Sequence, residues 1–221
     1  MLLPYVRAVI EQRALSEHDA KTLLASHGVP VSREQVVDTA AEAVEAARTI
    51  GHPSVLKLCG AEIMHKTELG GVKLGLVGDA AVLAAAEELL EVGPQGAQLL
   101  VAEQVTGSRE LIAGVTNDPQ FGATLMFGLG GIFAELLGDV VFRLLPASTS
   151  EIASMLDDLA NPQILDEFRG EPRVDRRQLV AALDGLAVCA SDRDVLESID
   201  INPLIVSDGT AIAVDALVVM R

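Results

Sequence analysis

The sequence predicts an α+β (α/β) fold built from two lobes. Helix and strand signals alternate in the first half of the chain, and a run of strand signals, a long helix signal and a final hairpin signal follow. This order favours two packed α+β units over one doubly wound sheet. Half of the 221 residues are hydrophobic and 22% are charged, so the chain can bury a substantial core.

The first half contains clear helix-start signals. Ser16 with Asp19 predicts the start of a helix over 16–27, because the hydroxyl of Ser16 can cap the first turn. Ser32 with Gln35 predicts the start of a second helix in the same way. The second helix is expected to end near residue 50, and the remaining expected elements are strands at 55–58, 72–77 and 98–105 and a helix at 80–91.

Strand signals dominate the second half. A turn at 117–119 is expected to join two strands, and the turn at 207–209 is expected to join the strands of the closing hairpin. Ser148 with Glu151 predicts a further helix start. The expected strands are 110–116, 123–127, 140–145, 199–206 and 211–219, with a glycine-rich loop at 128–131 and a helix at 175–190.

The charge balance excludes several classes of partner. The chain has 16 Lys and Arg against 32 Asp and Glu, which gives a formal net charge of −16. Such a surface repels nucleic acids and anionic membranes, so we expect neither as a partner. The aromatic content of 3% also provides few platforms for stacking bases.

Cysteine usage and hydropathy indicate a cytoplasmic protein. Cys59 and Cys189 are far apart and outside any CxxC pattern, which disfavours a disulfide framework or a zinc site. The apolar start of the chain contains Arg7 and Glu11, so it does not resemble a signal peptide. The longest uncharged run, 119–134, is broken by glycines and is too short to cross a bilayer.

The segment 54–76 carries the densest functional signal. It places Lys57 on an expected strand, then a polar loop, then Gly70-Gly71 before a second strand. A strand, a glycine loop and a strand can lay backbone amides and a lysine along a phosphate chain. The sequence has neither GxxxxGK[ST] nor a complete GxGxxG, which argues against Walker-type and Rossmann-type sites. Taken separately, Lys57 is also consistent with a solvated strand end, and Gly70-Gly71 is equally consistent with a hairpin turn.

His65 lies in the polar loop of this segment and has three interpretations. The three interpretations are a surface histidine, a metal ligand and a nucleophile. No other His or Cys stands at metal-ligand spacing, which weakens the second interpretation. The neighbouring Lys66 favours the neutral imidazole, which is the form that can attack phosphorus.

A second signal lies at the C-terminal end of the chain. The segments IDINPLIV and AIAVDALVV place Asp200, Asn202 and Asp215 on the two strands of the expected hairpin. Oxygen ligands on adjacent strands suit Mg²⁺. The alternative is a polar hairpin face, but carboxylates within otherwise apolar strands are costly to bury unpaired. The glycine-rich segment 127–135 is a third and weaker phosphate-binding signal.

Taken together, these motifs resemble a known family. In chain order they are LK, IxHKxxxGGV, ExxxGVxxDPxFG, FGxGGxxxE, RG, DxNPL and VDA, and they extend over about residues 15–219. The chain resembles the ATP-grasp domain of the ADP-forming acyl-CoA (acetate–CoA) synthetases, in the form that is a separate β subunit. It is similar, more distantly, to the β chain of succinyl-CoA synthetase.

The resemblance implies an ATP-grasp fold in which two α+β lobes clamp a nucleotide. Residues 1–221 would form a single ATP-grasp domain. The smaller lobe would comprise about 34–105, and the larger lobe about 1–33 with 106–221. The family usually has Ser-Pro-Asp where this chain has residues 60–62, Gly-Ala-Glu, and a small or apolar residue where this chain has Arg109.

The resemblance also implies a role for individual residues. His65 would be the phosphorylated histidine. Asn202 and Asp215 would bind Mg²⁺, while Arg143 and Arg169 match basic positions without an assigned role. The nucleotide-binding residues would be Lys57 at the phosphates, Glu103, Gln104 and Val105 at the adenine, Glu110 near the ribose or phosphates, and Gly128, Gly130 and Gly131 on the phosphate side of the larger lobe.

The implied activity is that of an acid–thiol ligase (ADP-forming) of the acetate–CoA ligase type. The chain would transfer a phosphoryl group between a phosphohistidine and ADP or ATP with Mg²⁺. It would be active only with a CoA-binding α subunit, in a hetero-oligomer, because 221 residues are used up by this domain alone. The alternative is a detached ATP-grasp domain of a protein acetyltransferase, acting as a ligand-sensing or assembly module.

Overall fold

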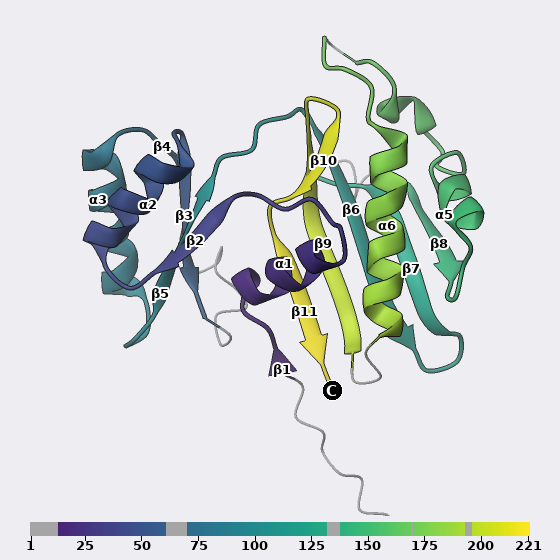
Figure 1. Cartoon of the computed structure of the whole chain (residues 1–221), viewed down its shortest axis with the longest axis horizontal. Helices are drawn as coiled ribbons and strands as arrows, with labels where there is room; N and C mark the ends of the chain where they lie inside the picture. The colour runs from purple at the N-terminus through teal and green to yellow at the C-terminus, as the bar shows by residue number, and fades with distance from the viewer. Residues whose placement is uncertain (1–12, 61–69, 132–137, 169, 193–195) are drawn as a thin grey trace, which may run out of the picture.

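The computed structural model describes residues 13–60, 70–131, 138–168, 170–192 and 196–221. Two antiparallel β-sheets organise these residues, one with four strands and one with seven. Figure 1 shows the four-stranded sheet with helices α2 and α3 on the left and the seven-stranded sheet with α1, α5 and α6 on the right. We call these two units the smaller lobe and the larger lobe. Their combination confirms the expected α+β class.

The smaller lobe contains two helices packed on one sheet. The sheet has the order β2-β5-β3-β4, and α2 and α3 contact each other and the sheet. Leu56 and Leu58 of β3 are buried against these helices, which leaves Lys57 to face the other side of the sheet. The elements are β2 (Glu34–Val37), α2 (Ala40–Ile50), β3 (Ser54–Cys59), β4 (Val72–Leu76), α3 (Asp79–Val92) and β5 (Gln98–Glu103).

The larger lobe has the strand order β1-β11-β9-β6-β7-β8, with β10 paired to β9. Helix α6 packs on β6, β7, β9 and β10, and α5 packs on β8 and α6 (Figure 1). The elements are β1 (Arg13–Ala14), α1 (Glu17–Ser26), β6 (Arg109–Asp118), β7 (Gly122–Leu129), β8 (Val140–Leu144), α5 (Thr149–Met155), η1 (Pro162–Leu165), α6 (Arg176–Ser191), β9 (Leu196–Ser207), β10 (Thr210–Ala213) and β11 (Ala216–Met220).

Helix α1 is fixed at both of its ends. Ser16 is its N-cap, and the hydroxyl of Ser16 accepts a hydrogen bond from the backbone N–H of Asp19, as expected from the sequence. At the other end, a Cβ atom at Gly185 of α6 would lie 2.1 Å from the carbonyl oxygen of His27. Only glycine allows this approach, so α6 holds the end of α1 against the larger lobe.

The expected start of the second helix is wrong. The segment after Ser32 forms strand β2, which pairs with β5, and α2 begins only after Thr39. Thr39 and Glu42 form a complete capping box, in which each side chain accepts a hydrogen bond from the other residue's backbone N–H. The sequence therefore did contain the correct capping signal, at Thr39, seven residues after Ser32.

Two further expectations about local structure need correction. Gly128 is a residue of β7 rather than of a loop. Asp215 lies between β10 and β11 rather than on a strand, because the expected strand 211–219 is divided into two strands that both pair with β9. The hairpin therefore contributes three strand segments to the larger sheet, and Asp215 stands at the break.

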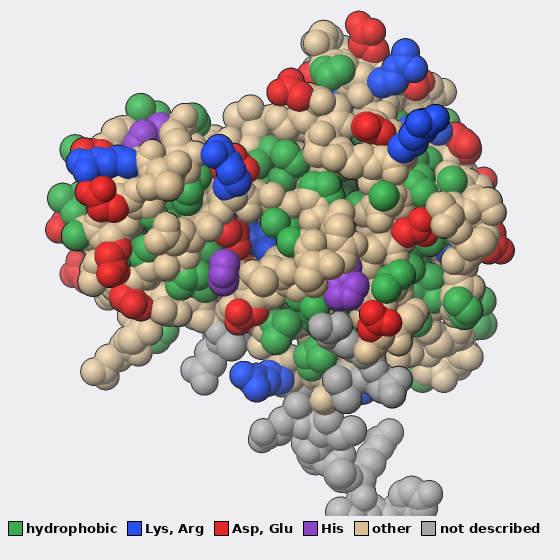
Figure 2. All heavy atoms as spheres, viewed as in Figure 1, with side chains coloured by type: hydrophobic (Ala, Val, Ile, Leu, Met, Phe, Trp, Pro, Cys, Tyr) green, Lys and Arg blue, Asp and Glu red, His purple; other side chains and the backbone are tan. Residues whose placement is uncertain are grey.

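Charged side chains are distributed over both lobes. Figure 2 shows acidic side chains scattered over the visible face of each lobe, in keeping with the net charge of −16. Within the described ranges, no helix combines the length and apolar character needed to cross a membrane.

Candidate functional site

A cavity of about 340 Å³ lies where the two lobes meet. Its walls come from β3, β4 and β5 of the smaller lobe and from β9 and the β10–β11 connection of the larger lobe. Five of the residues expected to bind nucleotide or metal line it together: Lys57, Glu103, Gln104, Val105 and Asp215. The sequence separates these residues by up to 158 positions, and the fold places them around one space.

Lys57 is the central cation of this cavity. Its side chain is 9% exposed, and its ammonium group lies 2.7 Å from a carboxylate oxygen of Glu17, 2.8 Å from the carbonyl oxygen of Val214 and 3.5 Å from a carboxylate oxygen of Asp215. An ammonium group has three N–H donors, and each has an acceptor here. Lys57 is thus a buried, fully paired lysine and not a solvated strand end.

Two residues that were not predicted from the sequence lie beside Lys57, and one of them, Glu17, contacts it. Glu17 and Lys21 of α1 are buried and lie 2.8 Å apart, and Glu17 contacts Lys57 with the same oxygen. The buried face of α1 consists of Glu17, Ala20, Lys21 and Leu24, which have the i, i+3, i+4, i+7 spacing of an apolar stripe. The sequence therefore contained one signal for these residues: two charged residues at the positions of an apolar helix stripe.

Lys21 is completely buried and has several polar partners. It forms ion pairs with Glu17 and Glu34, and it donates to the Ser32 hydroxyl and to the Val214 carbonyl oxygen at 3.3 Å each. Burial acts to lower the pKa of Lys21, but the two carboxylates outweigh it and raise the pKa above its ordinary value. Lys21 is therefore a cation at neutral pH, and it lies beneath the cavity.

Asp200, Asn202 and Asp215 share the open face of the larger sheet. Ala216 pairs with Ile201, so the next step of this register places Asp215 opposite Asn202. The backbone N–H of Val214 donates to the carbonyl oxygen of Pro203 at 3.2 Å, which holds the β10–β11 connection against β9. The register therefore places Asn202 and Asp215 opposite each other, and their binding of a metal stays a prediction.

The donor set of this group fits a divalent cation. Asp200 is exposed at the sheet surface, but partial desolvation by its neighbours raises its pKa, and the nearby Asp215 carboxylate raises it further. Two carboxylates that repel each other gain from a shared cation, and carboxylate and amide oxygens are the ligands that Mg²⁺ prefers. The Asp215 side chain is 45% exposed, so it remains accessible from the cavity.

The residues expected at the adenine form the link between the lobes. Glu103 ends β5, and its carboxylate accepts hydrogen bonds from the backbone N–H and the Nε of Arg33, both at 2.8 Å. The Gln104 side chain accepts from the backbone N–H of Gly75 at 2.6 Å. These contacts hold the segment that contains Val105 at the cavity wall.

Glu110, Gly130 and Gly131 also lie together, beside the cavity. Glu110 pairs with Ile205, which lines the cavity from β9. The N–H of Gly130 donates to the Glu110 carbonyl oxygen at 2.8 Å. Gly131 has a φ of +63°, and a Cβ atom there would lie 2.8 Å from a carboxylate oxygen of Glu110. Position 128 requires glycine for a different reason, because a Cβ atom there would lie 2.5 Å from the Asp139 carbonyl oxygen.

Two of the predicted residues lie outside the described residues, and two others have a structural contact. His65 and Arg169 fall in the ranges that the structure does not describe. Arg143 donates to Ser154 and forms an ion pair with Asp158, which attaches α5 to β8. Arg109 is buried and donates to the carbonyl oxygens of Ile164, Asp166 and Pro172.

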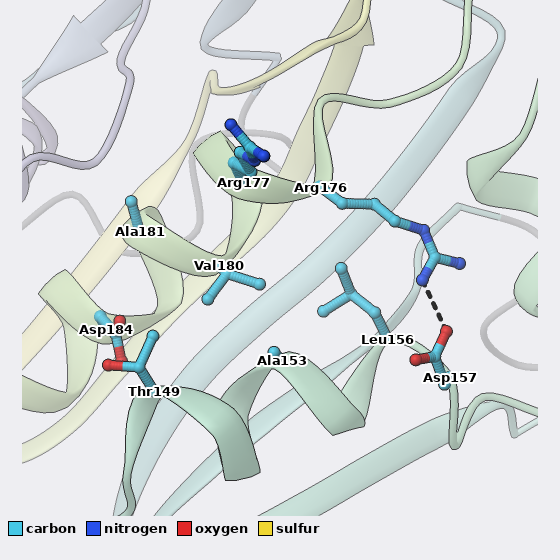
Figure 3. A pocket seen from close by; sticks show the side chains of 9 residues that line it. All are labelled: Thr149, Ala153, Leu156, Asp157, Arg176, Arg177, Val180, Ala181 and Asp184. Carbon is cyan, nitrogen blue, oxygen red and sulfur yellow. Dashed lines mark hydrogen bonds and ion pairs between the residues drawn. The ribbon is translucent and has the colours of Figure 1, made fainter.

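A second groove lies on the side of the larger lobe that faces away from the smaller lobe (Figure 1). Helices α5 and α6 form it around Leu156 and Val180, with an Arg176–Asp157 ion pair at one end (Figure 3). Its volume is about 440 Å³, larger than that of the cavity between the lobes. Its lining contains none of the residues expected to bind nucleotide or metal, so volume alone does not identify the site.

Comparison with known proteins agrees with the geometry. A family model described as an ATP-grasp domain matches residues 8–220. The chain belongs to the ATP-grasp family. It is 34% identical to the acetate–CoA ligase [ADP-forming] I subunit beta of Pyrococcus furiosus, and the match covers 97% of this chain and 95% of that subunit.

Solved structures of this ATP-grasp type have the same fold. Acetyl-coenzyme A synthetase 1 of Ca. Korarchaeum cryptofilum, in complex with coenzyme A and Ca-AMPCP, superposes with a TM-score of 0.87 at 35% identity over 95% of this chain and 94% of that chain. A structure of the same enzyme with coenzyme A and Mg-AMPPCP gives a TM-score of 0.81 at 37% identity over 94% and 93% of the two chains. That structure is described as having its phosphohistidine segment pointing towards the nucleotide-binding site.

Proposed function

We propose that the chain is the nucleotide-binding β subunit of an ADP-forming acyl-CoA synthetase of the acetate–CoA ligase type. The observation that supports this most strongly is the convergence of Lys57 and Asp215 on one cavity, from different lobes. The reaction would be acyl-CoA + ADP + phosphate ⇌ carboxylic acid + CoA + ATP. This chain would perform the step between a phosphohistidine and the nucleotide.

Each group of the cavity has a part in this proposal. Lys57 would hold the nucleotide phosphates, and the segment Glu103–Gln104–Val105 would receive the adenine between the smaller lobe, about 34–105, and the larger lobe. Asn202 and Asp215 would hold Mg²⁺, which when bound neutralises phosphate charge. Catalysis would then consist of positioning and charge neutralisation, which is typical of phosphoryl transfer.

His65 is the proposed phosphoryl carrier. Its neutral imidazole would attack the γ-phosphorus of ATP, the bond between that phosphorus and the bridging oxygen would break, and ADP would leave. The reverse step would return the phosphoryl group to ADP. A CoA-binding α subunit in a hetero-oligomer would supply the remaining half of the reaction. Two relatives that match this chain over nearly their whole length are named as beta subunits, which supports the need for a second subunit.

The alternative, a ligand-sensing or assembly module, is not favoured. A module of that kind does not need both a buried lysine at a cavity and a carboxylate pair suited to Mg²⁺. Relatives that match this chain over nearly their whole length are ligase subunits.

Phosphoryl labelling tests the proposed function. The chain is incubated with γ-labelled ATP and Mg²⁺, with and without a CoA-binding α subunit, and an acid-labile, base-stable label is expected. His65→Ala should abolish the label and leave Mg–ADP affinity nearly unchanged. His52→Ala, in an exposed turn, is the matched control and should label like the parent chain. A labelled His65→Ala variant would show that another residue carries the phosphoryl group.

A further inference from the structure

Two lysines from different lobes meet at one backbone carbonyl. The ammonium groups of Lys21 and Lys57 lie 3.3 and 2.8 Å from the carbonyl oxygen of Val214. One carboxylate oxygen of Glu17 lies 2.8 Å from Lys21 and 2.7 Å from Lys57. Glu17, Lys21, Lys57 and the Val214 carbonyl therefore form one compact cluster, which we call the inter-lobe cluster.

The cluster connects the two proposed ligand-binding groups of the nucleotide site. Lys57 stands on β3 of the smaller lobe, and Val214 directly precedes Asp215 in the β10–β11 connection of the larger lobe. Glu17 and Lys21 stand on α1, which packs against the larger lobe through β11 and α6. Neither Glu17 nor Lys21 lines the cavity, so both act beneath it.

Stability alone does not account for this arrangement. Buried ion pairs lose much of their attraction to the cost of desolvation, and apolar residues of similar volume often serve stability equally well. Lys21 is fully buried and Glu17 is 3% exposed, so both pay that cost in full. What an apolar replacement lacks is a directed contact with both Lys57 and the Val214 carbonyl.

We propose that Glu17 and Lys21 are positioning residues that set the separation between Lys57 and Asp215. Glu17 restricts a long lysine side chain to one rotamer before the nucleotide binds, so that less conformational entropy is lost on binding. Lys21 and Lys57 both donate to the Val214 carbonyl and fix its direction. Because Val214 directly precedes Asp215, this also fixes the backbone position of Asp215. This inference rests on the proposed function of Lys57 and Asp215.

The test uses a charge-balanced double variant, K21M/E34Q. It removes one cation and its carboxylate partner together, while Glu17 and Lys57 remain as a pair. Glu34 also contacts the His18 ring at 3.0 Å, at the edge of the cluster. Calorimetry on the full chain measures ADP affinity with and without Mg²⁺. We expect the affinity for Mg–ADP to fall about tenfold, as for other residues that orient ligand-binding groups, and the affinity for metal-free ADP to fall less.

A conservative variant and two controls complete the design. Glu17→Asp keeps the charge and shortens the reach by one carbon–carbon bond, so it should fold and also weaken Mg–ADP binding. Lys57→Met should remove binding with or without metal. Arg48→Met removes an exposed ion pair with Asp79 in the smaller lobe and should leave both affinities unchanged.

The outcomes separate the inference from the proposed function. If the parent chain does not bind Mg–ADP, the proposed function fails. If the parent chain binds and Lys57→Met does not, but K21M/E34Q and Glu17→Asp bind Mg–ADP like the parent chain, the positioning role is refuted. If the double variant does not fold, Glu17→Asp decides by itself. An equal loss with and without Mg²⁺ in K21M/E34Q would also refute it, because Lys21 acts through the Val214 carbonyl on Asp215, whose proposed role depends on the metal.

Discussion

The ammonium group of Lys57 lies 3.5 Å from a carboxylate oxygen of Asp215, although the two residues stand in different lobes. Both residues line the cavity between the lobes. A nucleotide phosphate carries the charge that Lys57 attracts, and a divalent cation carries the charge that Asp215 attracts. Binding of a metal–nucleotide complex would therefore replace this ion pair with a contact between Lys57 and a phosphate and a contact between Asp215 and the cation.

Asp215→Asn should weaken the metal-dependent part of nucleotide binding. The amide keeps the size of the side chain and removes the negative charge that would hold Mg²⁺. The stabilisation of the chain by ADP should then become nearly independent of Mg²⁺, as measured by the shift in Tm with and without the metal. Asp208→Asn, in the exposed turn between β9 and β10, is the control. Retention of the full Mg²⁺ effect in Asp215→Asn would remove Asp215 from the metal site.

Arg109→Met should destabilise the chain without changing nucleotide affinity. The buried guanidinium donates to three backbone carbonyl oxygens between residues 164 and 172 and to Glu171. Removing it takes away the donor that these three carbonyl oxygens share and the ion pair with Glu171, at a cost of about 3–5 kcal/mol in the free energy of unfolding. Urea denaturation measures this loss. Arg177→Met, on the surface of α6, should cost less than about 0.5 kcal/mol.

Glu171 should link stability to pH. Hydrogen bonds from Ser108, and then the contact with Arg109, lower the pKa of Glu171 below its ordinary value. The folded state therefore favours the carboxylate. Its contribution is fully present above the ordinary glutamate pKa and is lost as the pH falls through the lowered pKa. Glu171→Gln should be less stable than the parent chain at neutral pH, and this difference should shrink on acidification. A difference that is constant with pH would contradict the assignment.

The sequence predicted the cavity residues better than it predicted their contacts. The family resemblance implied that Lys57, Glu103 and Asp215 belong to one site, and all three line the cavity between the lobes, while their binding roles stay predictions. The partners of Lys57 were missed because Glu17 and Lys21 have the composition of a solvated helix face. Their helical spacing with Ala20 and Leu24 was the one signal that this face is buried, and the packing of α1 on β2, β11 and α6 explains why it is.

The wrong predicted start of α2 has a physical reason as well. A Ser with a Gln three residues later and a Thr with a Glu three residues later are both valid capping patterns, and local sequence does not decide between them. Pairing of β2 with β5 decides it, because that contact extends Glu34–Val37 and delays the helix until Thr39. Long-range strand pairing of this kind overrides local propensity.

Gly131→Ala should affect both stability and nucleotide binding, whereas Gly122→Ala should affect stability alone. Both glycines have positive φ values, +63° and +79°, so an alanine at either position costs about 1–2 kcal/mol in backbone strain. They differ in their surroundings. A Cβ atom at Gly131 would lie 2.8 Å from a carboxylate oxygen of Glu110, and a Cβ atom at Gly122 would have no heavy atom within 4 Å.

The comparison of these two variants isolates the role of Glu110. If Glu110 contacts the nucleotide, displacing its carboxylate should lower Mg–ADP affinity several-fold in Gly131→Ala, while Gly122→Ala should bind like the parent chain. Urea denaturation measures the shared loss of stability, and calorimetry measures the affinities. Glu110→Ala should lower the affinity by itself, and adding Gly131→Ala to it should cause little further loss, because the crowded carboxylate is already gone. Equal affinities in all four variants would place Glu110 outside the nucleotide site and would leave the close approach of Gly131 as a matter of packing alone.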